Sequence, residues 1–95
     1  MTILEHAPDA DAVLDWVDAQ VRALQEQGAE PRTVLAGPVA YERLCAAMAA
    51  RFGREPGPFE QYQWLALVVD PFREDALCVL PTTRDLAGGT RAERV

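Results

Sequence analysis

Apolar residues recur at helical spacing in two segments of the chain. The first stripe ends before Gly28 and predicts a helix over residues 10–27; its members are Val13, Leu14, Val17, Val21 and Leu24. The second stripe follows Gly37-Pro38, and proline fits the first turn of a helix because it lacks an N–H. This stripe predicts a second helix over residues 38–52, with Tyr41, Leu44, Cys45, Met48 and Phe52 on one side.

Short apolar runs between and after these helices predict strands. Thr33–Ala36 is one strand, and two further runs flank Asp70-Pro71, a good start for a turn. We interpret these two runs as a β-hairpin with strands at Gln63–Val69 and Ala76–Leu80. The hairpin strands are apolar on both faces, so both faces need cover, either from the chain's own helices or from another molecule.

The order helix, strand, helix, hairpin predicts a small α+β domain with two helices and a sheet of three or four strands. The strand-helix-strand portion is expected to form a right-handed crossover. If both helices cover one face of the sheet, the apolar residues of the other face have no cover within the chain. One domain is expected over residues 1–81, and residues 82–95 predict a flexible tail because they lack periodicity and contain Gly88-Gly89.

The charge balance and the missing residue types narrow the function. The chain has 9 Arg and no Lys against 15 acidic residues, so its net charge of −6 disfavours a nucleic-acid partner. No apolar run is long enough for a bilayer and no secretory leader is evident, so no membrane partner and a cytoplasmic location are expected. The composition therefore favours a protein partner over nucleic acid or membrane.

Catalytic chemistry has few candidate residues. The chain lacks Ser and Asn as well as Lys, and its one histidine is His6. These absences exclude a serine triad, a Schiff-base lysine, a P-loop and a multi-histidine metal site. Cys45 and Cys78 are the remaining nucleophiles, with no further histidine to activate them, and small buried hydrophobic residues are their simpler interpretation. We therefore expect no catalytic residue, metal or cofactor.

Five residues are candidates for an interface with another protein: Phe72, Arg73, Trp16, Tyr62 and Trp64. Phe72 is a large apolar residue within the polar loop DPFRED, where it either folds back onto the domain or contacts a neighbouring subunit. Tyr62 and Trp64 follow the loop REPGP, and Trp16 lies beside the first helical stripe. Each of these aromatic residues could instead close one side of the core.

A small-molecule site is the alternative function. A strand that enters a helix through Gly37 can cradle an anion on free backbone N–H groups, and the aromatic residues between Phe59 and Trp64 could form a shelf for a ligand. Close packing of strand against helix is the simpler interpretation of the glycine. This alternative predicts a concave pocket with convergent polar groups at the helix start.

The segment from Ala10 to Pro81 resembles the A-domain of Hong-Kong-97-type capsid proteins, which tailed phages and encapsulins share. The likeness rests on Val34-Leu35-Ala36 followed by Tyr41 and Leu44, and then on Val68-Val69-Asp70-Pro71 and Val79-Leu80-Pro81. The peripheral domain and spine helix of such shell proteins do not fit in 95 residues. The chain is therefore similar to the truncated, A-domain-only proteins grouped as family-four encapsulins.

The resemblance implies a capsid A-domain-like fold and a non-enzymatic role in assembly. Its expected partners are further copies of the chain, in a homo-oligomer, or a metabolic enzyme encoded nearby, since family-four encapsulins are thought to associate with such enzymes. The apolar strands of this short chain lead to the same expectation, because association would supply their missing cover.

Overall fold

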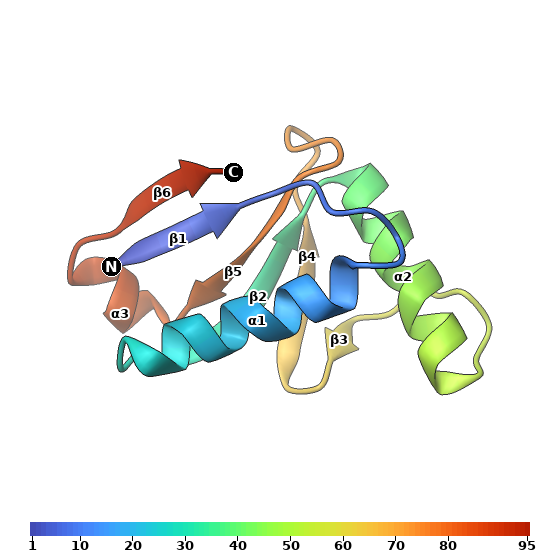
Figure 1. The fold of residues 1–95 in the computed structure, drawn as a ribbon, viewed down its shortest axis with the longest axis horizontal. Helices are drawn as coiled ribbons and strands as arrows, with labels where there is room; N and C mark the ends of the chain where they lie inside the picture. Colours follow the sequence, from blue (N-terminus) through green and yellow to red (C-terminus); the bar gives the residue numbers. More distant parts are fainter.

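The chain forms two layers, a β-sheet and a pair of helices that cover one of its faces (Figure 1). The computed structural model describes residues 1–95. Its elements in chain order are β1 (Thr2–Glu5), α1 (Val13–Glu26), β2 (Pro31–Ala36), α2 (Pro38–Phe52), β3 (Gln61–Tyr62), β4 (Leu65–Val69), β5 (Leu77–Pro81), α3 (Thr83–Ala87) and β6 (Arg91–Arg94). The α+β class and both long helices agree with the prediction. No helix is long and apolar enough to cross a membrane.

The main sheet has four strands in the order β3-β4-β2-β5. β2 and β4 are parallel and are joined through α2, as the strand-helix-strand interpretation requires. The predicted hairpin, however, is wrong. β5 pairs antiparallel with β2 rather than with β4, so β2 lies between the two apolar strands that follow it in the sequence.

The position of β2 between β4 and β5 requires a close approach between Gly37 and the loop after β4. We call residues 70–76 the tip loop; it crosses the end of β2 on its way to β5 (Figure 1). A Cβ atom at Gly37 would overlap the backbone of Glu74. The Gly37 N–H also donates to the carbonyl of Ala76 at 2.9 Å. A seven-residue connection is long enough to pass over one strand, whereas a tight hairpin turn is not.

The two faces of the sheet differ sharply in burial. Val34, Leu65 and Leu77 point towards the helices and are fully buried, in one core with the apolar stripes of α1 and α2. The opposite side, which we call the outer face, carries Thr33, Leu35, Ala66, Val68, Cys78 and Leu80, and all of these except the buried Cys78 are partly or fully exposed. Both long helices therefore cover the same face, and the outer face lacks a second layer of long helices.

The two ends of the chain pair with each other. β1 and β6 form a separate parallel ladder, and β1 reaches the main sheet through a bridge between His6 and Leu77. The sequence predicts neither β1 nor the secondary structure of residues 82–95, which contain α3 and β6 in place of an irregular tail. All four residues of β6 are exposed, so they give no apolar periodicity from which a strand could be predicted.

Candidate functional site

The tip loop is held in one shape by its own polar groups. Asp70 accepts a hydrogen bond from the N–H of Phe72 at 3.0 Å through its side chain, and one from the N–H of Arg73 at 3.2 Å through its carbonyl. An aspartate that bonds the backbone two residues ahead favours a turn. The N–H of Ala76 donates to the carbonyl of Arg73 at 2.9 Å and closes the loop.

Arg73 joins this loop to the first strand. Its Nε donates to Asp70 at 2.9 Å, and its Nη1 donates to Glu5 of β1 at 2.6 Å. All three side chains are about three-quarters buried, so the interactions are less screened than those of a surface pair. Arg73 therefore acts within the chain as an anchor for the loop, with its guanidinium committed to two carboxylates.

The start of α2 forms the third attachment of the loop. The N–H groups of Val39 and Ala40 donate to the carbonyl of Glu74 at 3.0 and 3.3 Å. These are first-turn donors that have no partner within a helix and are free to bind an anion. Here the chain's own carbonyl occupies them, so the helix start offers no open cradle to a ligand.

Large apolar side chains gather around this anchored loop. Phe72 is 92% exposed, and Val39 and Val69 are 41% and 44% exposed. Val69 pairs with Ala36 at the last position of β2, and Val39 follows two residues after the strand-to-helix turn, so all three lie at the same end of the sheet. We call Val39, Val69 and Phe72 the apolar end. The loop is rigidly built, yet its largest apolar side chain lies in solvent.

The apolar end continues onto an open strand edge. β3 pairs only with Leu65 and Ala66, and the N–H of Leu67 donates to the carbonyl of Glu60 at 2.9 Å, so β4 has no neighbour on that side beyond Leu67. The N–H of Asp70 donates to β2, and because successive backbone groups alternate in direction, the N–H of Val69 points to the open side. The outer strand of the separate two-stranded ladder, β6, has the charged sequence RAER. Charge discourages pairing at β6, whereas the β4 edge has no charged side chain.

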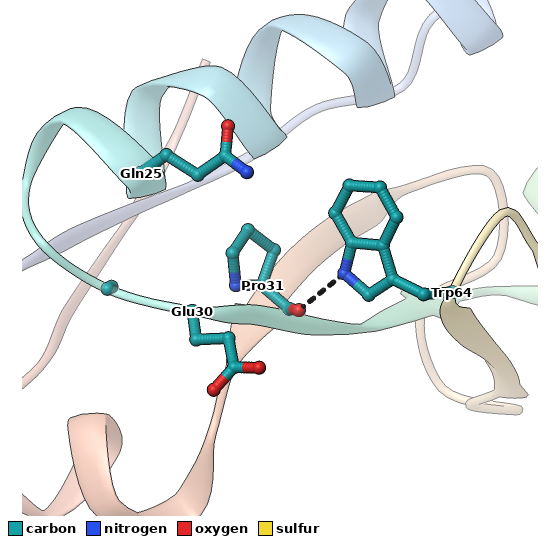
Figure 2. A pocket seen from close by; sticks show the side chains of 5 residues that line it. Gln25, Glu30, Pro31 and Trp64 are labelled. Carbon is teal, nitrogen blue, oxygen red and sulfur yellow. Dashed lines mark hydrogen bonds between the residues drawn. The ribbon is translucent and has the colours of Figure 1, made fainter.

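Trp64 is the other exposed aromatic residue among the predicted interface residues. Its indole N–H donates to the carbonyl of Pro31 at 3.0 Å, and half of the side chain faces solvent, at 48% exposure. It lines a shallow hollow of about 340 Å³ with Gln25, Ala29, Glu30 and Pro31 (Figure 2). This hollow is at the N-terminal end of β4, away from the tip loop.

Tyr62 and Trp16 have roles inside the chain. Tyr62 is fully buried; its hydroxyl donates to Asp18 of α1 at 2.7 Å and accepts from Arg51 of α2 at 3.1 Å. Burial and the bond to Asp18 raise the pKa of Tyr62 to about 12. Trp16 is partly buried against the core, with its ring 5.6 Å from that of His6. Of the five predicted interface residues, only Phe72 and Trp64 are substantially exposed.

The cysteines occupy separate buried positions. Cys45 lies on α2 and Cys78 on β5, and both are free thiols. Burial raises the pKa of Cys78, and the nearby Arg73 offsets only part of that effect. A raised pKa disfavours the thiolate, which is the reactive form of cysteine. No group of three or more His, Cys, Asp or Glu side chains is placed to hold a metal ion.

Comparison with known proteins identifies no relative of this chain. No family model, no curated protein and no solved structure matches the chain. The candidate site is therefore defined by the geometry of the apolar end alone. The sequence pattern indicates Phe72 and Arg73 but not Val39 and Val69; Val69 lies in the part of β4 that the short strand β3 does not reach.

Proposed function

We propose that the chain is a non-enzymatic assembly module that self-associates through the apolar end, in the manner of a truncated, capsid A-domain-like shell protein. The main support for this proposal is the exposure of Phe72 on a well-anchored loop. This residue is 92% exposed on a loop that is fixed by Asp70, by the Arg73–Glu5 pair and by the start of α2.

The energetics support a binding role for this ring. Complete burial of a phenylalanine side chain stabilises a complex by roughly 2 kcal/mol. A side chain on a flexible loop would lose part of this gain, because binding would have to order the loop. The tip loop is already held by hydrogen bonds and ion pairs within the chain. Phe72 thus has the properties of a preorganised contact residue.

The alternative, a small-molecule site, receives less support from the geometry. The N–H groups at the start of α2 already bind the carbonyl of Glu74. Tyr62 is buried, while the hydroxyl of Tyr41 is bonded to the backbone of Phe59, donating at 2.8 Å and accepting at 3.1 Å. The start of α2 and the aromatic residues between Phe59 and Trp64 therefore do not line one common cavity, as this ligand site would require.

The resemblance to family-four encapsulins leads to a second candidate partner, a metabolic enzyme. The apolar end would serve such a partner equally well. We favour self-association because the unpaired end of the β4 edge and the exposed valines beside it carry no charge, so a second copy can approach them without the repulsion expected between chains of net charge −6.

Sedimentation velocity over a wide concentration range tests the proposal. A weight-average mass that rises with concentration above 10.5 kDa is the expected result. A chain that stays monomeric throughout, with no enzyme copurifying, would contradict it.

A further inference from the structure

The largest hollow of the molecule lies at the end of β5 opposite to the tip loop that carries Phe72. It has a volume of about 470 Å³ and is lined by Arg32, Thr33, Leu80, Pro81, Thr82, Thr83 and Leu86. Leu80 and Leu86 are partly buried and provide apolar surface, and Arg32 contributes a guanidinium. A hollow of this size is large enough for an aromatic side chain, since pockets of about 300 Å³ upward accept small ligands.

The wall of this hollow is fixed by hydrogen bonds. The side chain of Thr82 accepts from the N–H of Asp85 at 3.2 Å, which caps α3. Asp85 in turn accepts from the N–H of Glu30 at 3.0 Å, and the N–H of Thr82 donates to the carbonyl of Glu30 at 3.0 Å. These bonds attach α3 to the start of β2, so the hollow exists before any partner binds.

The hollow and the tip loop cannot meet within one chain. The tip loop precedes β5, whereas Leu80 and Pro81 end that strand and α3 follows directly (Figure 1). The two features therefore lie at opposite ends of the same strand. When two complementary surfaces lie at opposite ends of a molecule, contact between two copies is head to tail. Repetition of this contact builds a closed ring or an open filament.

The tip loop and the hollow each carry an exposed charge that can pair across a contact between two copies. Phe72 is followed by Glu74 and Asp75, while the charge of Arg73 is taken up by Asp70 and Glu5. In the hollow, Arg32 has only an ion pair with Glu30 at 3.4 Å, and both side chains are more than half exposed. An exposed pair of this kind contributes little energy, so Arg32 can exchange Glu30 for an acidic group of a second chain.

We propose that Phe72 of one copy inserts into the hollow of a second copy, between Leu80 and Leu86, with Arg32 of the receiving chain beside Glu74 of the inserting chain. This inference rests on the proposed self-association and specifies its geometry. It makes the contact heterologous, so that every subunit supplies one tip and one hollow.

Two variants that each remove one side of the contact test this geometry. Phe72→Ala removes the tip and leaves the hollow intact, whereas Leu86→Glu places an acid in the hollow and leaves the tip intact. Circular dichroism and thermal unfolding establish that both variants are folded. Each variant alone is expected to sediment as a monomer, and an equimolar mixture is expected to form a one-to-one heterodimer and nothing larger.

A charge reversal provides an independent test that does not disturb the apolar surface. Arg32→Glu is expected to weaken self-association at least tenfold, and the double variant Arg32→Glu/Glu74→Arg is expected to regain most of it. Arg22→Glu makes the same change on the exposed side of α1 and serves as the matched control, with no expected effect.

The outcomes separate this inference from the proposed function. If the wild-type chain associates but the equimolar mixture stays monomeric, or Leu86→Glu associates like the wild type, the head-to-tail contact is wrong and self-association stands. If the wild-type chain is monomeric at every concentration, self-association itself is wrong, and the contact with it.

Discussion

The backbone of Glu74 lies directly against Gly37, at a distance that leaves no room for a Cβ atom. This contact allows the tip loop to cross the end of β2, so that β4 and β5 lie on either side of that strand instead of pairing with each other. The same crossing brings the carbonyl of Glu74 to the first turn of α2. The absence of a side chain at Gly37 therefore permits both this strand order and the position of Phe72.

Gly37→Ala is expected to destabilise the chain by about 3 kcal/mol, because the added methyl group meets backbone rather than a movable side chain. Chemical denaturation measures the change in the free energy of unfolding. Gly88→Ala is the matched control: the nearest atom to its added Cβ would be the Asp85 carbonyl oxygen at 3.4 Å, an ordinary contact distance. Equal stabilities for the two variants would show that the loop does not cross β2 as described.

Tyr62→Phe is expected to lower stability by about 1 kcal/mol at neutral pH, because it removes the hydroxyl that links Asp18 of α1 to Arg51 of α2. The variant should also alter the alkaline part of the stability profile. The pKa of Tyr62 is about 12 in the folded chain, above its ordinary value of 10.0, so the folded state retains the proton longer than the unfolded state.

The stabilisation from the neutral phenol is accordingly complete below pH 10 and is lost as the pH rises through about 12. Urea denaturation between these two pH values should give a steeper loss of stability for the wild-type chain than for Tyr62→Phe. Parallel profiles would mean that the Tyr62 hydroxyl is not buried against Asp18.

Glu5→Gln is expected to weaken the attachment of the tip loop to β1 and to cost about 1 kcal/mol, since Glu5 and Arg73 are largely buried and in direct contact. Amide hydrogen exchange should accelerate at Phe72 and Arg73 in this variant. The control is Glu93→Gln, which affects an exposed pair with Arg91 and should change neither stability nor exchange in the loop. Unchanged exchange in Glu5→Gln would show that the pair does not hold the loop.

Local patterns predicted the elements of this fold better than their pairing. The stripes containing Val17 and Leu44 predict α1 and α2 because a helix satisfies its hydrogen bonds within one segment. Strand pairing is settled between distant segments, and the apolar runs around Asp70-Pro71 fit a hairpin as well as they fit two strands separated by β2. The short charged strand β6 has no periodicity from which it could be predicted.

In the candidate site, too, local sequence features were predictable and features that depend on the fold were not. Phe72 stood out in the sequence because its neighbours are polar, and the structure leaves it in solvent. Tyr62 and Trp64 are two residues apart and indistinguishable by residue type, yet one is buried between the helices and the sheet and the other is half exposed. Their difference depends on the left-handed backbone of the intervening Gln63, with φ of 56°, which the sequence does not indicate.

Self-association through Phe72 is tested by sedimentation velocity of the wild-type chain beside Phe72→Ala and Phe52→Ala, over the same range of concentrations. Phe52 is also exposed, at the end of α2, and so controls for the loss of an exposed phenyl ring. We expect the wild type and Phe52→Ala to associate with rising concentration, whereas Phe72→Ala remains a monomer of about 10.5 kDa with unchanged thermal stability. Association of Phe72→Ala equal to that of the wild type would contradict this expectation.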